Sequence, residues 1–197
     1  PGRKVLLNDV NPYLVTMWKA GRDGWNPPEH PTEQDYVHYN KLRPLDDPMT
    51  GYLGVAWSFG GKFFGGPAKD YRKTPHNGSY FTGSYKSTLD KIKILRQNDV
   101  QFSVGSYDEV KIPARSMVYA DPPYEGRTPQ SSANGKFDRN YYFGYMNKLA
   151  KANTVIATEF INTPDWEVLH DYGDTVVRHL NAKPADGTVE LLLRVRP

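Results

Sequence analysis

The stretch SMVYADPPY, from Ser116 to Tyr124, decides the fold of this 197-residue chain. Its first half is a short apolar run that predicts a buried strand, and Asp121 stands at the end of that strand. Pro122 and Pro123 hold the backbone extended and remove two N–H donors, so the Pro122 carbonyl can point outward as an acceptor. Beside the Asp121 carboxylate it makes an acceptor pair suited to an exocyclic amine, with Tyr124 placed to stack on a flat ring. A strand-ending turn with a solvated aspartate is the alternative.

Strands and helices alternate on both sides of this stretch. Short apolar runs predict further strands, and amphipathic segments with capping residues predict helices. The predicted strands cover residues 4–9, 100–104, 154–159, 175–180 and 188–195, and the predicted helices cover 11–21, 32–43, 84–97, 139–151 and 164–170. This alternation predicts an α/β domain with a mostly parallel sheet and an antiparallel carboxyl-terminal strand.

Composition limits the possible functions. The chain has 25 Lys and Arg against 22 Asp and Glu, a net charge of +3, with 38% hydrophobic residues. There is enough apolar material for a core, and no apolar run approaches the ~20 residues of a membrane helix. The absence of cysteine excludes thiol nucleophiles and Cys-ligated metals, and the five histidines lack metal-ligand spacing. We therefore expect a soluble, cytoplasmic protein that uses oxygen, nitrogen, aromatic or backbone groups.

A second polar strand end lies near the amino terminus. Asp9 and Asn11 follow the apolar run of the first predicted strand, where ligands of parallel α/β sheets bind. An acidic side chain at this place can accept hydrogen bonds from ribose hydroxyls. Asn11 before Pro12 is also a good helix cap, so capping of the following helix is an equally simple interpretation.

Residues 51–83 have a different character from the rest of the chain. Eight glycines interrupt any regular period, and aromatic and cationic residues fill the intervals. This pattern predicts a functional loop region rather than regular structure.

Four segments together resemble one protein family. The Asp121–Tyr124 run is similar to the signature of S-adenosylmethionine-dependent amino methyltransferases that act on DNA adenine. The other three segments are Asn8–Val15, Ser58–Gly66, and Thr158–Phe160 followed by Pro164–Trp166. They resemble, in the same order along the chain, elements of the Dam-like, phage-type DNA adenine methyltransferases.

The resemblance implies a Rossmann-like methyltransferase sheet with an inserted DNA-recognition region. Residues 1–50 and 112–197 would form the catalytic domain and residues 51–111 the target-recognition region. It assigns cofactor binding to Asp9, Asn11, Tyr107 and Asp121, and the grip on a flipped adenine to Asp121, Pro122, Pro123 and Tyr124. The methyl group would pass directly from S-adenosylmethionine to the adenine amine, with no metal.

The same resemblance implies double-stranded DNA as the partner. The candidate DNA-binding residues are Lys62, Phe63, Lys69, Tyr71, Arg72, Lys73 and Arg127, with Phe64 and Tyr80 as further stacking candidates. Residues 125–136 would close over the flipped base, and Glu159 would line the site. Each lysine taken singly is equally consistent with a solvated surface charge.

The chain departs from the family at its front. Dam-like enzymes begin with a strand that ends in Phe-x-Gly-x-Gly, a loop that passes the methionine part of the cofactor, and no such segment precedes Asp9. In the family that strand lies between the strands that here end at Asp9 and Asp121, so we expect two unpaired strand edges. A separate amino-terminal fragment could supply it. The alternatives are a catalytically incomplete DNA-binding subunit, or methylation of the exocyclic amine of cytosine.

Overall fold

The computed structural model describes residues 4–67, 80–123, 137–159, 166–172 and 191–196. The chain divides into two compact units. The first comprises Pro1–Val110 with Gln130–Ala133, and the second comprises Lys111–Pro129 with Asn134–Pro197. The boundary at residue 110 lies next to the predicted one at 111, but residues 1–50 share a unit with residues 51–110 and not with the carboxyl-terminal half.

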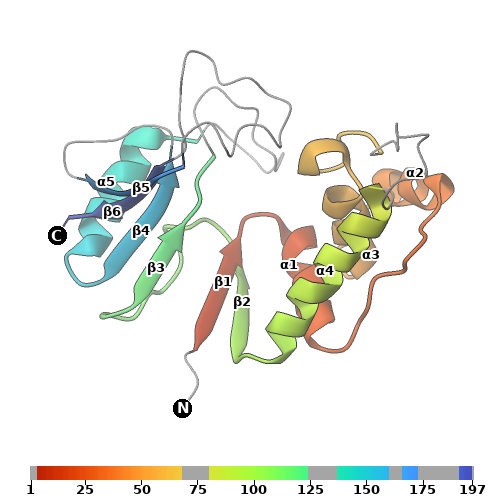
Figure 1. Ribbon diagram of the computed structural model, residues 1–197, viewed down its shortest axis with the longest axis horizontal. Coiled ribbons are helices and arrows are strands. Elements are labelled where there is room, and N and C mark those ends of the chain that lie inside the picture. The colour runs from red at the N-terminus through yellow and green to blue at the C-terminus, as the bar shows by residue number, and fades with distance from the viewer. Residues whose placement is uncertain (1–3, 68–79, 124–136, 160–165, 173–190, 197) are drawn as a thin grey trace. The chain divides into compact units, whose positions relative to one another are not determined.

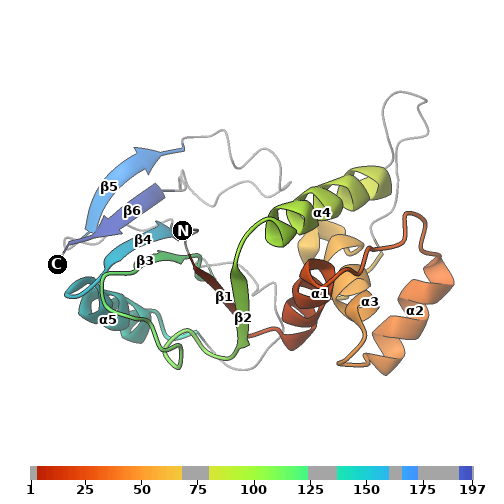
Figure 2. The same cartoon turned by 90° about the horizontal axis from the view of Figure 1, so that it is seen from below.

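The first unit combines a two-stranded parallel sheet with a group of helices (Figures 1 and 2). Strands β1 (Val5–Asp9) and β2 (Val100–Val104) pair in register from Val5 opposite Val100 to Asp9 opposite Val104. The helices are α1 (Pro12–Arg22), α2 (Glu33–Leu42), α3 (Pro48–Gly51) and α4 (Tyr80–Arg96), with a π-helical turn at Tyr52–Ala56 and a 3₁₀ turn at Phe59–Gly61.

Two helix starts follow the predicted capping chemistry. The Asn11 side-chain oxygen accepts hydrogen bonds from the N–H groups of Tyr13 (3.1 Å) and Leu14 (3.3 Å). Thr32 and Asp35 form a reciprocal capping box at the start of α2. The sequence therefore located both starts correctly, because capping depends on neighbouring residues alone.

Residues 48–57 correct the prediction of a loop region. They form α3 and the π-helical turn, and they belong to a core cluster made of Met17, Tyr36, Tyr52, Leu53 and Trp57. A Cβ added to Gly51 would come within 2.2 Å of the Tyr13 carbonyl oxygen, and one added to Gly54 would come within 2.4 Å of the Phe63 ring. These glycines therefore allow close packing of helices, and they do not mark a loop.

Replacing Gly51 by Ala is expected to destabilise the protein by about 3 kcal/mol, because the new methyl group meets fixed backbone of α1. Gly83 is the matched control, since it lies exposed in α4 with open space around it. Gly83→Ala should stabilise by about 0.5 to 1 kcal/mol through helix propensity. Urea unfolding of both variants measures the difference. Equal effects would contradict the packing role of Gly51.

Tyr52 makes stability depend on alkaline pH. Its side chain is fully buried, and this desolvation raises the pKa to about 12. The tyrosine of the unfolded chain ionises near pH 10, so the folded state holds the proton more tightly and stability falls as the pH rises from 10 towards 12. Between pH 9 and pH 11 we expect the ionisation of Tyr52 to lower the free energy of unfolding by about 1 kcal/mol. Urea titrations at the two pH values should show a smaller loss for Tyr52→Phe; equal losses would refute this assignment.

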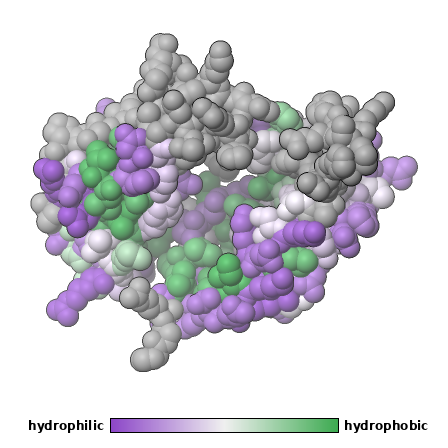
Figure 3. All heavy atoms as spheres, in the orientation of Figure 1, coloured by the Kyte–Doolittle hydropathy of each residue, from purple (hydrophilic) through white to green (hydrophobic). Residues whose placement is uncertain are grey.

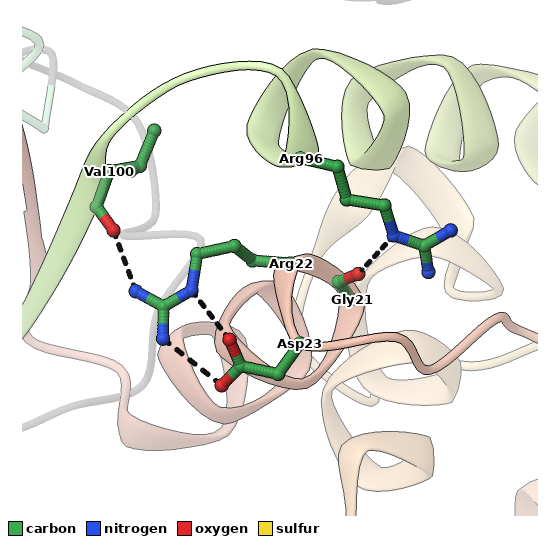
Figure 4. Close-up of polar contacts among 5 residues, drawn as sticks. All are labelled: Gly21, Arg22, Asp23, Arg96 and Val100. Atoms are coloured by element: carbon green, nitrogen blue, oxygen red, sulfur yellow. Dashed lines mark hydrogen bonds and ion pairs between the residues drawn. The ribbon is translucent and has the colours of Figure 1, made fainter.

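Two arginines fasten the end of α1 to its neighbours (Figure 4). Arg22 donates from Nη1 to the Val100 carbonyl at 2.6 Å and also pairs with Asp23. Arg96, in the last turn of α4, donates from Nε to the Gly21 carbonyl at 2.8 Å. The Arg96 contact satisfies a carbonyl at the end of α1, and the two arginines together link α1 to both β2 and α4.

The described residues of the second unit form a four-stranded mixed sheet and one helix. The elements are β3 (Met117–Ala120), α5 (Arg139–Ala150), β4 (Thr154–Glu159), β5 (Trp166–Asp171) and β6 (Leu191–Val195). The strand order is β3-β4-β6-β5, with β3 parallel to β4 and β6 antiparallel to both of its neighbours. The chain is thus α/β with parallel pairs, and the predicted antiparallel carboxyl-terminal strand is confirmed.

Strand β5 contradicts the helix predicted over residues 164–170. Trp166 lies opposite Val195 in the pairing with β6, and Glu167 bonds to Arg194 across the two strands. Pro164 and Asp165 resemble a helix start, but strand pairing with a distant segment outweighs that local signal. The strand predicted over residues 175–180 lies outside the described residues.

Strands β1 and β3 each have a single strand partner among the described residues. β1 pairs with β2, and β3 pairs with β4. Apolar surface is visible over the β1–β2 sheet in Figure 3. The exposed apolar residues there are 38% to 54% accessible: Val5, Leu6, Leu7, Val10 and Val104. Met117 and Tyr119 of β3 are 69% and 62% exposed.

Candidate functional site

The carboxyl ends of β1 and β2 form the first polar edge. Because the strands are parallel and Asp9 lies opposite Val104, the residues after each strand come to the same end of the sheet. Asn8 links these ends, donating from Nδ2 to the Gly105 carbonyl at 3.0 Å and accepting from the Ser103 hydroxyl at 2.8 Å. The fold thereby brings the predicted cofactor residues Asp9 and Tyr107 to one edge.

Asp9 is held in place through one carboxylate oxygen. Its Oδ1 accepts a hydrogen bond from the Asn11 N–H at 2.7 Å, while Oδ2 has no hydrogen-bond partner among the described residues. Burial raises the pKa of Asp9 above its usual value, and the bond from Asn11 partly opposes this shift. Both interpretations of the segment therefore have support, because capping of α1 is the work of Asn11, and Asp9 keeps an oxygen for a ligand.

The turn after β2 carries the remaining groups of this edge. Gly105 has a φ of 151°, and its N–H donates to the Asp9 carbonyl at 3.2 Å. Glu109 accepts from the Ser106 N–H at 3.2 Å, and the Ser106 hydroxyl bonds to Asp108. Tyr107 is half-buried in this turn. The edge thus combines a carboxylate, hydroxyls and an aromatic ring.

The carboxyl ends of β3 and β4 form the second polar edge, within the second unit. Ala120 lies opposite Ala157, so Asp121 and Thr158 are neighbours on adjacent parallel strands. The buried Thr158 hydroxyl donates to Asp121 Oδ1 at 2.9 Å, and Tyr119 donates to Thr158 at 3.5 Å. Asp121 is exposed and Pro122 is buried. The carboxylate is therefore exposed, and the Thr158 hydroxyl holds its orientation.

Glu159 has a different place from its predicted one. Its side chain is fully buried, and its Oε1 lies 2.9 Å from Nη1 of Arg139, at the start of α5. Arg139 is itself only 18% exposed. A carboxylate enclosed in this way does not line an accessible site, and the pair instead joins α5 to β4.

The structure describes only part of the predicted DNA-binding set. Lys62 is exposed, whereas Phe63 is 9% exposed and stacks on Tyr13 with ring centroids 5.2 Å apart. Contact between Phe63 and DNA would therefore require this packing to open. The predicted residues that lie outside the described residues are Lys69, Tyr71, Arg72, Lys73, Tyr124 and Arg127, together with the loop 125–136.

The sequence did not predict a functional role for three side chains whose contacts or exposure in the structure suggest one. Thr158 had a signal, since it follows an apolar strand in the same way as Asp121. Phe59, 60% exposed, lies within the glycine-rich segment that was singled out. Arg43 was read only as the end of a helix, and its position beside Phe63 and Phe64 depends on tertiary contacts that no local pattern reveals.

The described residues contain no group of three or more His, Asp or Glu side chains that could hold a metal ion. In the same part of the chain, no helix has the length and apolar character required to cross a bilayer. No known protein-family model matches the chain, and neither does any curated protein sequence.

Proposed function

We propose that the chain is an S-adenosylmethionine-dependent methyltransferase of Rossmann-like fold that modifies the exocyclic amine of adenine in double-stranded DNA. The single observation that carries the proposal is the second polar edge, where an exposed Asp121 is oriented by Thr158 directly before two prolines. Such a fixed acceptor suits an amine that must be held in one direction. The segment resemblances point to the same chemistry.

The first polar edge fits the methyl donor. A half-buried carboxylate with one oxygen engaged by Asn11 and the other open can accept hydrogen bonds from ribose hydroxyls. Tyr107, in the turn after β2, supplies an aromatic surface for a purine ring. When bound, S-adenosylmethionine supplies a methyl group activated by its sulfonium. Asp9 and Tyr107 bind and orient it.

The second polar edge would hold the acceptor amine. Asp121 and the Pro122 carbonyl would accept the two amine hydrogens, which fixes the direction of the nitrogen lone pair. Asp121 and the Pro122 carbonyl would hold the amine while it accepts the methyl group of the sulfonium, and the methylated amine would then lose its extra proton to water. Asp121 therefore orients the amine, and it does not need to act as a strong base. Thr158 is a positioning residue, because it acts through Asp121.

Thr158→Val should lower the rate of methyl transfer on the order of tenfold, since it removes one hydrogen bond to a charged carboxylate at constant side-chain shape. Thr158→Ser restores the hydroxyl and should recover most of the rate. Single-turnover assays with radiolabelled S-adenosylmethionine measure both variants. A purely structural role predicts that Ser fails to rescue the rate while stability changes in parallel.

A calorimetric titration tests the enzyme function. S-adenosylmethionine is titrated into the protein alone and into the protein with duplex DNA, and nucleosides from the treated DNA are analysed by mass spectrometry. We expect cofactor heat and N6-methyladenine. DNA binding without cofactor heat would instead support a DNA-binding subunit, and a methylated cytosine amine would change the substrate.

The proposal includes a further strand as a partner, contributed by an amino-terminal fragment that carries the glycine loop. β1 has a single strand partner among the described residues, so its other edge can offer backbone N–H and C=O groups to a further strand. Hydrogen exchange of the chain alone should be fast at the β1 amides that face away from β2. Slow exchange at all five β1 amides would exclude an open edge.

A further inference from the structure

Arg43 occupies an unusual backbone position. It ends α2 with φ 46° and ψ 54°, the left-handed region that favours glycine or asparagine, and its N–H donates to the Tyr39 carbonyl at 2.9 Å. This conformation is disfavoured for an arginine, because its Cβ lies close to the following carbonyl oxygen. Such strain commonly marks positions where the side chain is needed.

The guanidinium of Arg43 is held by hydrogen bonds, and its charge has no carboxylate partner in the part of the chain that the structure describes. It lies 5.2 Å from the ring centroid of Phe64 and 5.6 Å from that of Phe63. Nε and Nη2 donate to the Asn40 backbone and side-chain oxygens at 3.0 and 2.8 Å. Within the described residues no carboxylate pairs with Arg43, and Nη1 has no acceptor there. A guanidinium stacked on aromatic rings with open donors is well suited to bind a phosphate.

The neighbouring loop presents a second cation and an exposed ring. Phe59 is 60% exposed and is followed by Gly60 and Gly61, with φ values of 63° and 70°. The base of the loop is closed by a bridge between Ser58 and Pro67 and by the bond from the Phe59 N–H to the Gly66 carbonyl. This closure holds Phe59 outward on a defined backbone.

The aliphatic part of the Lys62 side chain packs over Gly65. A Cβ added to Gly65 would come within 2.9 to 3.0 Å of three Lys62 side-chain carbons, so the stem of Lys62 lies directly over Gly65. Lys62 is exposed, and no carboxylate among the described residues pairs with it. It belongs to the same loop as Phe63 and Phe64, on which Arg43 stacks.

We infer that Arg43, Lys62 and Phe59 form a DNA-binding surface, in which the two cations contact backbone phosphates of the duplex and Phe59 packs against a base or sugar. This inference rests on the proposed function for its choice of DNA as the ligand. Fixed cations without acidic partners, beside an exposed aromatic ring, match the two components of DNA binding: phosphate neutralisation and apolar contact.

Fluorescence anisotropy with a labelled DNA duplex, measured over a series of salt concentrations, tests the surface. Arg43→Asn removes the charge and keeps a residue that tolerates the left-handed backbone. It should weaken binding about tenfold and reduce the salt slope of log K by about 1. Phe59→Ala should weaken binding about fivefold or more with the salt slope unchanged, because the lost contact is apolar. Lys41→Gln, an exposed lysine on α2, is the matched charge control.

Several outcomes overturn the inference. One is a salt slope of log K for Arg43→Asn equal to that of Lys41→Gln. The others are an unchanged DNA affinity of both Arg43→Asn and Phe59→Ala, or no DNA binding by the wild-type protein. Methyl transfer is assayed in parallel on the same proteins. If the surface variants bind DNA and transfer the methyl group normally, the proposed function stands and the DNA-binding surface is refuted. If DNA binding depends on Arg43 but the protein transfers no methyl group, the surface stands and the proposed function is refuted. Thermal unfolding confirms that each variant is folded.

Discussion

Replacing Asp121 by Asn is expected to lower methyl transfer to DNA by about 10² to 10³-fold while leaving the fold intact. The substitution keeps the shape of the side chain but replaces the anion that accepts from the adenine amine with a neutral amide, which weakens an acceptor needed to orient the attacking nitrogen. The Thr158 hydroxyl, at 2.9 Å, would still find an oxygen at this position. Single-turnover kinetics with radiolabelled S-adenosylmethionine measure the loss.

Asp46→Asn is the matched control for this prediction. Asp46 is an exposed aspartate in the turn before α3, so the same change of charge there should leave the rate within twofold. Because Asp121 is also exposed, its replacement should change stability by less than about 1 kcal/mol. Full activity of Asp121→Asn would remove Asp121 from the proposed mechanism. Loss of activity together with unfolding would assign it a structural role.

The largest effect on stability is expected from Arg139→Met. The substitution leaves the carboxylate of Glu159, fully buried in β4, without the guanidinium that lies 2.9 Å away. Breaking a buried ion pair from one side costs about 3 to 5 kcal/mol, because the remaining charge stays desolvated and loses its ion-pair partner. Urea unfolding at neutral pH measures the change in the free energy of unfolding.

The same unit offers a matched surface pair for comparison. Arg194 contacts Glu167 at 2.5 Å, but their side chains are 51% and 38% exposed. Arg194→Met should therefore cost at most about 1 kcal/mol. Replacing both buried partners, as Arg139→Met with Glu159→Leu, should recover most of the lost stability. A cost for Arg139→Met no larger than for Arg194→Met would show that burial does not set the strength of the interaction.

Local signals in the sequence predicted a large part of the fold. Asn11 and Thr32 mark the starts of α1 and α2, because a side-chain oxygen next to free backbone N–H groups is effective in any context. The apolar runs before Asp9, at 100–104, before Asp121 and at 154–159 became β1 to β4. The polar residues that end β1 and β3 lie at the two polar edges, because each directly follows an apolar run that forms a strand.

The failures arose where distant segments decide the outcome. Residues 166–171 became a strand through pairing with β6, and residues 48–57 became buried helix because Gly51 and Gly54 permit close contact with α1 and Phe63. Phe63, a predicted DNA-stacking residue, packs on Tyr13 through a contact between distant segments. No local pattern distinguishes a glycine that closes a helix contact from one that bends a loop.

The sequence by itself determined the α/β alternation, the capped helices and the presence of an aspartate at the end of two strands. Tertiary structure alone decided which distant groups contact those strand ends: the Gly105 N–H bonds to the Asp9 carbonyl, and the Thr158 hydroxyl bonds to the Asp121 carboxylate. It also placed Arg43 on Phe63 and Phe64 and enclosed Glu159 with Arg139. The physical reason is that capping and strand formation act over a few neighbouring residues, whereas strand register and side-chain packing join residues far apart in the chain.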